Sequence, residues 1–262
     1  MKVSVIILTG NNEDFIGKCL ESVAGFADEI VLIDSHSTDK TLTIAKKFNC
    51  RIVNQPWLGF SRQRTIAAKY AANDWIFYLD VDERMTQELK AEIAGLTAKS
   101  LAEAGFQVKR RNYIFGKWLK KGGWYPDWQT RLINKTKLKK WVGRLHERPL
   151  LTGSTGQLNG AIIHLTHRGI NWNLNKSLIY TEPVADLIFK SGHVRVRWWH
   201  LFTAPARQFW YRGIVKGGLF EGMEGLIAVL YQAFDTFITY AKLWEKQQPE
   251  SMPQKYKKLD GR

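Results

Sequence analysis

Short apolar runs alternate with helical patterns through the first eighty residues. Residues 3–8 form a continuous aliphatic run that predicts a buried strand, and the apolar positions between Phe15 and Val23 follow helical spacing up to Gly25. The same order recurs with strands expected at 30–33, 51–53 and 75–79 and with helices expected from about 38 to 48 and over 61–72. This β-α alternation predicts a parallel sheet with helical crossovers.

Acidic side chains follow three of the expected strands. Glu13 and Asp14 come after the first strand, Asp34 ends the second, and Asp80 and Asp82 come after the run 75–79. The carboxyl ends of parallel strands share one edge of the sheet, and open α/β sheets bind their ligands there. The three loops are therefore expected to build one pocket.

The pair Asp80 and Asp82 suggests a metal site. Two carboxylates one residue apart offer hard oxygen ligands to one Mg²⁺ or Mn²⁺, an ion that commonly keeps waters and takes other ligands from phosphates. The alternative is an acidic turn that caps a helix opening near Thr86. The first strand is followed by neither Gly-x-Gly-x-x-Gly nor a Walker-type loop, which argues against a Rossmann oxidoreductase and a P-loop protein. A nucleotide held by carboxylates and a metal remains.

Composition narrows the class of partner. The 262 residues are 45% hydrophobic, enough for a core domain plus an appendage. The 39 Lys and Arg against 24 Asp and Glu give a formal charge of +15, which favours nucleic acid, a phosphorylated substrate or an anionic membrane. Cys19 and Cys50 fall in core stretches, and no signal-peptide pattern opens the chain, so we expect a reduced cytoplasmic protein.

The middle of the chain continues the mixed pattern. A helix is expected from Thr86 to about Ala104, followed by strands at 106–108 and 161–165. Residues 109–123 mix cations with aromatic residues, so they are suited to bind a sugar, which stacks on aromatic rings, or a diphosphate. The same composition would suit a nucleic-acid surface, but no recognised nucleic-acid module accompanies it.

The character of the chain changes beyond residue 170. A helix expected over 173–190 precedes a stretch that interleaves Trp198, Trp199 and Trp210 with arginines, and 226–243 is mostly apolar yet carries charges. Such residues suit the headgroup level of an anionic membrane, although no 18-residue uncharged run predicts a spanning helix. The alternative is a helical subdomain that buries its aromatic residues. We expect a catalytic domain over 1–170, a helical, membrane-surface extension over 171–246 and a polar tail over 247–262.

Several segments together resemble a known enzyme family. VSVIILT at 3–9, VLIDSHSTD at 31–39 and LDVDE at 79–83 resemble the inverting family 2 glycosyltransferases with the GT-A fold. GGWYPDWQTRL at 122–132 and LHER at 145–148 resemble the bacterial lipopolysaccharide core branch typified by heptose β-1,4-glucosyltransferases. The resemblance implies an α/β GT-A fold with a mostly parallel sheet and a helical, aromatic-rich C-terminal extension. It also implies a UDP-linked donor and a Mg²⁺ or Mn²⁺ ion. The implied reaction is transfer of a sugar, with glucose as the favoured one, to the lipopolysaccharide core with inversion.

The resemblance also implies roles for individual residues. It puts Thr9 and Glu13 in the base pocket, Asp34 on the uracil or ribose, Arg64 on the donor, Asp80 on the ribose or the metal, and Asp82 on the metal. Two positions depart from the family pattern. Asn11-Asn12-Glu13 stands where Asn-Glu-Glu is usual, and Thr65 follows Arg64 where Asn is usual.

Inversion needs a group that takes the acceptor proton, and three residues are candidates. They are Asp127, His146 and Glu147, with Asp127 favoured because it stands in a rigid Pro-Asp-Trp corner. Arg131 is expected either to pair with Asp127 or to clamp the donor diphosphate. His164 and His167 are further candidates for a metal or diphosphate contact, and structural roles are the alternative for both.

The expected partners are a UDP-sugar donor, a lipid-linked lipopolysaccharide core acceptor and an anionic membrane surface, with no nucleic acid. The expected location is cytoplasmic, peripheral on the inner face of the bacterial inner membrane. The competing hypothesis is a non-catalytic basic protein that binds nucleotide or nucleic acid through the same pocket.

Overall fold

The computed structural model describes residues 1–97, 102–143 and 147–261. Within them the chain forms two compact units. The first comprises Met1–Tyr113 and Tyr125–Thr166, and the second comprises Ile114–Trp124 and His167–Arg262. The second unit thus includes a short segment that the sequence patterns left with the first.

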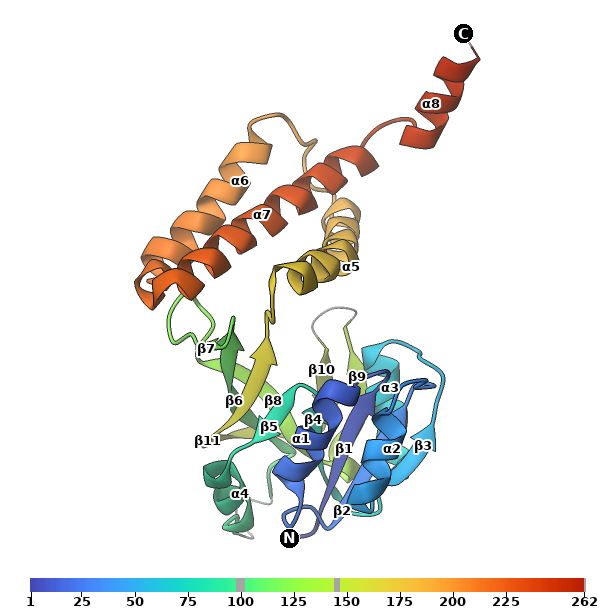
Figure 1. The fold of residues 1–262 in the computed structure, drawn as a ribbon, viewed down its shortest axis with the longest axis vertical. Coiled ribbons are helices and arrows are strands. Elements are labelled where there is room, and N and C mark those ends of the chain that lie inside the picture. The colour runs from blue at the N-terminus through green and yellow to red at the C-terminus, as the bar shows by residue number, and fades with distance from the viewer. Residues whose placement is uncertain (98–101, 144–146, 262) are drawn as a thin grey trace. The chain divides into compact units, whose positions relative to one another are not determined.

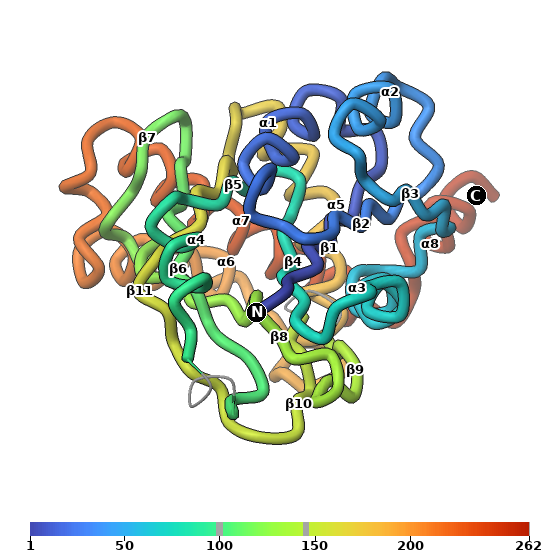
Figure 2. The backbone as a smooth tube through the Cα atoms, turned by 90° about the horizontal axis from the view of Figure 1, so that it is seen from below, coloured from blue at the N-terminus to red at the C-terminus, as the bar shows by residue number. Residues whose placement is uncertain are grey.

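The first unit begins with the alternating β and α elements that the sequence predicts. In chain order they are β1 (Val3–Thr9), α1 (Glu13–Val23), β2 (Glu29–Asp34), α2 (Thr41–Ala45) with η1 (Lys46–Phe48), β3 (Arg51–Asn54), α3 (Phe60–Ala67) with η2 (Ala68–Tyr70), and β4 (Trp75–Asp80). The strands pair in parallel in the order β3-β2-β1-β4, which Figure 2 shows edge to edge.

The rest of this sheet has antiparallel pairs. Its strands are β5 (Glu83–Met85), β6 (Gly105–Ile114), β7 (Lys117–Trp118), β8 (Asp127–Asn134) and β11 (Thr155–Thr166). β8 runs antiparallel to β4 and to β6, and β11 runs antiparallel to β5. After the single turn η4 (Lys135–Lys137), β9 (Leu138–Val142) and β10 (Arg148–Leu151) form a separate two-stranded sheet. The α/β GT-A class with a helical C-terminal extension is confirmed, and the parallel order is confined to four strands.

Apolar residues on both sides of the central strands account for this arrangement. Every residue of β1 is buried. Val5 and Ile7 face a core completed by α1, whereas Ile6 and Leu8 face a core completed by α3 and β9. A strand covered on both faces is apolar throughout, as the continuous run in the sequence indicates.

The helix expected from Thr86 to about Ala104 is shorter than predicted. α4 covers Gln87–Ala94, and Thr86 caps it by accepting a hydrogen bond from the Leu89 N–H at 3.3 Å. Gly95 ends it, because glycine is a poor helix former and its N–H closes the last turn on the Ala91 carbonyl. The Ala104 N–H instead bonds the Ser154 carbonyl at 2.7 Å, at the start of β6.

The second unit is helical (Figure 1). It contains α5 (Ile170–Lys190), α6 (His200–Phe209), the π-helix η5 (Trp210–Val215), η6 (Gly218–Glu221), α7 (Gly222–Lys246) and α8 (Met252–Asp260). α5 and α6 both pack on α7, and α8 begins in the stretch expected as a polar tail with a capping box formed by Ser251 and Gln254. In the described part of the chain, no helix has both the length and the hydropathy needed to cross a bilayer.

Candidate active site

The acidic loops meet at one edge of the sheet, as expected from the parallel order. Thr9 at the end of β1 lies opposite Asp34 at the end of β2, and Leu8 lies opposite Asp80 at the end of β4. The strand pairing therefore places the three loops that carry Glu13, Asp34 and Asp80 side by side.

Side-chain hydrogen bonds tie the loops after β1 and β2 to each other. The Glu13 carboxylate accepts a hydrogen bond from the Lys40 N–H at 2.9 Å, and the Glu13 N–H donates to Asp39 at 3.0 Å. Asp34 is buried and accepts from the backbone N–H and the hydroxyl of Ser37 at 3.0 and 2.5 Å. Both carboxylates thus shape the loops, and their expected roles in nucleotide binding stay predictions.

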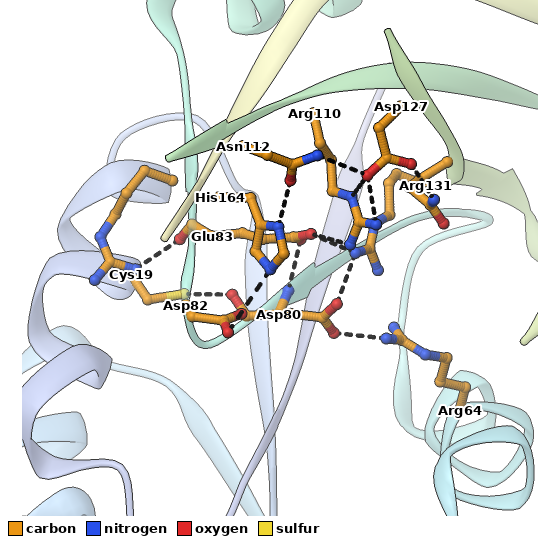
Figure 3. Close-up of polar contacts among 12 residues, drawn as sticks. Cys19, Arg64, Asp80, Asp82, Glu83, Arg110, Asn112, Asp127, Arg131 and His164 are labelled. Atoms are coloured by element: carbon orange, nitrogen blue, oxygen red, sulfur yellow. Dashed lines mark hydrogen bonds and ion pairs between the residues drawn. The ribbon is translucent and has the colours of Figure 1, made fainter. Parts of the chain in front are cut away.

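Asp80 lies between two guanidinium groups (Figure 3). Its Oδ1 is 2.6 Å from Nη2 of Arg64 in α3, and its Oδ2 is 2.6 Å from Nη2 of Arg131 in β8. Burial alone would raise the pKa of Asp80, but the two cations outweigh it and hold that pKa far below its usual range. Direct metal ligation by Asp80 stays a prediction.

A third carboxylate, Glu83, extends this cluster into the sheet. Glu83 is fully buried, and its Oε1 lies 2.5 Å from Nη2 of Arg131 and 3.6 Å from Nη1 of Arg110. Burial raises the pKa of Glu83 despite these cations, and the neighbouring Asp80 charge adds to the rise. Glu83 also accepts a hydrogen bond from the Asp80 N–H at 3.0 Å and so orients the loop that begins there.

Asp127 is held by three donors at the start of β8. Arg110 approaches one of its oxygens at 2.6 Å, Asn112 donates to that oxygen at 3.1 Å, and Gln129 donates to the other at 2.8 Å. Burial would raise the pKa of Asp127, but the Arg110 charge and these hydrogen bonds hold it below its ordinary value. Of the two roles expected for Arg131, the ion pair with Asp127 is replaced by ion pairs with Asp80 and Glu83, and the contact with the donor diphosphate stays a prediction.

The second acid of the loop, Asp82, faces His164 of β11. The distance from Asp82 Oδ2 to His164 Nε2 is 3.8 Å, and His164 Nδ1 lies 2.6 Å from Asn112 Oδ1. Because the Asn112 amide nitrogen donates to Asp127, its oxygen faces His164, and the Nδ1 atom must carry the proton. The Nε2 atom of His164 and the Asp82 carboxylate then face each other, and both groups can ligate a divalent cation.

Asp82 and His164 therefore fit a divalent cation that takes its other ligands from water and phosphate. No cluster of three or more His, Cys, Asp or Glu side chains suited to a metal occurs in the described residues. A site built here would rely on substrate oxygens to complete the coordination.

A cavity of about 300 Å³ opens beside the cluster. Its lining includes Arg64, Asp80, Arg110, Arg131 and Glu147. Of the three candidate bases, Glu147 lines this cavity and His146 lies outside the described residues. Asp127 does not line the cavity itself but bonds to Arg110 and Gln129, which do. His167 belongs to the second unit.

Sequence reasoning missed four members of the cluster, Glu83, Arg110, Asn112 and Gln129. Strand alternation is the signal that could have found them, because side chains two apart in a strand share one face. Arg110 and Asn112 share a face of β6, and Asp127, Gln129 and Arg131 share a face of β8. Arg110 also lies directly opposite Asp127 in the register of the two strands.

Comparison with known proteins identifies several relatives of this chain. The chain is 28% identical to the lipopolysaccharide core biosynthesis glycosyltransferase LpsC of Rhizobium meliloti (strain 1021), over 97% of this chain and 96% of that protein. It is 26% identical to an uncharacterized glycosyltransferase of Rickettsia typhi (strain ATCC VR-144 / Wilmington), over 93% and 87% of the two chains.

A solved structure with a similar fold is that of S. aureus TarS 1–349 in complex with UDP-GlcNAc. It matches with a TM-score of 0.48 and 18% identity, over 92% of this chain and 81% of that chain. Residues 4–149 match the model of the family described as Glycosyl transferase family 2, which is more than half of the chain. The chain therefore belongs to glycosyl transferase family 2.

Proposed function

We propose that this glycosyltransferase transfers a sugar from a UDP-sugar to the lipopolysaccharide core with inversion, and that the sugar is glucose. The observation that carries the proposal is the apposition of Asp82 and His164 beside the Asp80 cluster, at the edge where a parallel sheet binds nucleotides. The similarity to a lipopolysaccharide core biosynthesis glycosyltransferase over nearly the whole chain supports the acceptor class.

The donor would lie along the carboxyl edge of the parallel strands. Thr9 and Asp34 end neighbouring strands there and would contact the uridine. Arg64 and Arg131 line the cavity, and each keeps a buried Nε–H without an acceptor among the described residues. These groups would bind diphosphate oxygens, since guanidinium groups bind phosphate more strongly than neutral donors do.

Asp82 and His164 would hold a Mg²⁺ or Mn²⁺ ion. When bound, such an ion stabilises the negative charge on a leaving diphosphate. Asn112 would keep His164 in the tautomer that ligates a metal, and Asn112 in turn is held by Asp127. Asp80 would keep Arg64 and Arg131 in place beside the diphosphate.

Asp127 is the proposed base, with Glu147 as the alternate. The low pKa of Asp127 keeps it ionised at neutral pH, and its donors hold it in one orientation. Glu147 is half-buried in the cavity wall next to Arg148. An inverting base must lie opposite the leaving group, and both residues come from the part of the chain after the acidic loop.

An anionic membrane surface is the proposed location of the reaction, on the cytoplasmic face of the inner membrane. An exposed apolar row spaced by four residues begins in the turn before α6 and continues along α6 and η5. It consists of Trp198, Phe202, Ala206, Trp210 and Ile214. Residues 191–220 contain five Lys or Arg and no Asp or Glu. Aromatic side chains with flanking cations suit the headgroup region of anionic lipid.

Donor hydrolysis tests the proposed function most directly. Purified protein with UDP-glucose should release UDP slowly in Mg²⁺ or Mn²⁺, and excess chelator should abolish this release. Asp82→Ala should remove nearly all of it while the protein stays folded. UDP binding without any metal-dependent turnover, alone or with a lipopolysaccharide core acceptor, would favour the rival hypothesis of a non-catalytic nucleotide-binding protein.

A further inference from the structure

The helices of the second unit expose many large apolar side chains. Among the described residues, every exposed large hydrophobic side chain belongs to this unit except those of Met1, Trp57, Leu58 and Phe60. On α5 the exposed apolar residues include Leu178 and Ile179, each 67% exposed. Extended apolar surfaces of this kind mark sites where a protein contacts another protein or a membrane.

The helix α7 carries the most regular of these surfaces. Every exposed residue of α7 between positions 223 and 244 is apolar, and these residues are Met223, Leu230, Phe234, Phe237 and Trp244. Their spacings of three, four and seven residues place them on one side of the helix. We call this side the outer face of α7.

The charged residues of α7 in the same span are paired within the unit. Glu224 Oε2 lies 3.4 Å from Nζ of Lys117, and Lys242 Nζ lies 3.4 Å from Oε2 of Glu182 in α5. The third, Asp235, accepts a hydrogen bond from a hydroxyl of α5. The outer face of α7 can therefore leave water without burying an unpaired charge.

The contact between α5 and α7 is polar, in contrast to their exposed surfaces. The Ser177 hydroxyl of α5 donates to the Asp235 carboxylate and lies 2.6 Å from the Tyr231 hydroxyl of α7. Helices that pack in lipid place small and hydroxyl-bearing residues between them and large apolar residues outside, which reverses the usual arrangement in water. The buried residues of α5 fit the lipid pattern, because they are Asn173, Ser177, Thr181 and Ala185.

We propose that the outer face of α7 and the exposed apolar residues of α5 lie among the acyl chains of a lipid bilayer, below the headgroups. This inference rests on the membrane location given under the proposed function and extends it, because the apolar row of α6 is assigned there to the headgroup region. A helix with one apolar face lies along the bilayer surface with that face about 5–10 Å deep. Attachment at this depth depends on apolar burial, so salt should not reverse it.

A second copy of this chain could cover the same face, but two observations favour lipid. Helices that pair through an apolar seam commonly use charged residues beside it to select the partner, whereas Glu224 and Lys242 are already paired within the unit. Exposed apolar residues also continue beyond α7, along α5 and the apolar row of α6. The five Lys or Arg of residues 191–220 complement the charge of anionic headgroups.

A spin label can measure the depth of α7 in the bilayer. In a full chain carrying Cys50→Ser, a nitroxide is attached either at Leu230→Cys, on the outer face of α7, or at Gln87→Cys, an exposed position of α4. Cys19 is buried and stays unlabelled. With vesicles of phosphatidylglycerol and phosphatidylcholine, we expect the label at position 230 to be accessible to oxygen and protected from an aqueous nickel complex. The label at position 87 should show the opposite accessibility.

Sedimentation with the same vesicles tests which force holds the protein. Most of the bound protein should stay bound in about 1 M NaCl, where screening limits charge interactions to about 3 Å. In that salt the double variant Phe234→Ser/Phe237→Ser should bind about tenfold more weakly than the wild type. The matched control is Trp57→Ser/Phe60→Ser, which removes an exposed aromatic pair of the first unit and should bind as the wild type does. The label at position 230 tests the proposal independently if the Phe234→Ser/Phe237→Ser protein fails to fold.

Several results would overturn the insertion of α7. Release of the protein by salt, equal access of the nickel complex to both labels, or unchanged binding of Phe234→Ser/Phe237→Ser would leave a contact at the headgroups only. Protection of the label at position 230 without vesicles, in a dimer detected by analytical ultracentrifugation, would assign the face to a second copy. Metal-dependent UDP-glucose hydrolysis on the same sample separates the two claims, because its absence beside an inserted label contradicts the proposed function only.

Discussion

Replacing Asp80 with Asn removes one negative charge from a cluster that contains three arginines and three carboxylates. Arg64, Arg110 and Arg131 face Asp80, Glu83 and Asp127 through a continuous series of ion pairs. Asn at position 80 keeps the shape of the side chain but cannot neutralise two guanidinium groups. Arg64 and Arg131 would then share a deficit of one charge in a site from which water is largely excluded.

The loss of unfolding free energy in Asp80→Asn can be estimated from the burial of Arg64 and Arg131. The Arg64 and Arg131 side chains are 5% and 4% exposed, and breaking one partner out of a buried pair costs about 3–5 kcal/mol. Because Asp80 itself is 27% exposed, solvent screens part of the loss, and we take about 3 kcal/mol. For a chain of this size each kcal/mol lowers Tm by about 2–4 °C, so Asp80→Asn should melt about 6–12 °C below the wild type.

Asp82→Asn is the matched control in the same loop. Asp82→Asn leaves both Asp80–guanidinium pairs in place, so this variant should melt less far below the wild type than Asp80→Asn does. Thermal unfolding followed by circular dichroism at pH 7 measures both variants, and UDP-glucose hydrolysis should be abolished in both. An Asp80→Asn protein that melts within about 2 °C of the wild type would refute a structural role for the Arg64–Asp80–Arg131 pairing.

Three further predictions concern the base and the membrane. Asp127→Asn should lower the transfer rate at least about a hundredfold while UDP affinity stays within about threefold, and normal transfer by Asp127→Asn with loss in Glu147→Gln would assign the base to Glu147. The active form of Asp127 is ionised, and its pKa lies below the ordinary 3.8, so the transfer rate should fall only below about pH 4. A loss of rate that begins near pH 6 as the pH is lowered would contradict this. The double variant Trp198→Ala/Phe202→Ala should lower partitioning to phosphatidylglycerol vesicles about a hundredfold, at about 1.5 kcal/mol for each ring. Equal sedimentation of wild type and variant with these vesicles would count against the apolar row of α6 as the contact.

Patterns along the chain predicted the parallel half of the fold well because local periodicity and burial agree there. β1 and β4 are buried on both faces, β2 is mostly so, and each of the four strands is separated from the next by a helix, which leaves few alternatives. The antiparallel half depends on pairings between distant residues, such as Arg110 with Asp127, that no local pattern contains. For the same reason Asp80 and Asp82 were found from the sequence. Glu83, which pairs with Arg131, was not found, nor were Arg110, Asn112 and Gln129, which hold Asp127.

The assignment of ion pairs failed for a related reason. The sequence suggested Asp127, four positions away, as an ion-pair partner of Arg131. The partners in the structure are Asp80 and Glu83, which lie 51 and 48 positions away in the chain. Sequence distance is a poor guide within a strand, because the chain moves about 3.3 Å with each residue.

The thiol of Cys19 gives the active-site loop a built-in reporter. Cys19 is fully buried in α1, its Sγ lies 3.5 Å from the Asp80 carbonyl oxygen, and burial raises its pKa strongly. An alkylating reagent can react with it only when α1 separates from the loop, so its labelling rate measures the free energy of that local opening. Cys50 is half-buried, and its Sγ donates to the Ala45 carbonyl rather than to the acidic loop, so it provides an internal reference in the same chain. A nucleotide that closes the pocket would slow modification of Cys19 relative to Cys50, which makes donor binding measurable without any acceptor or product.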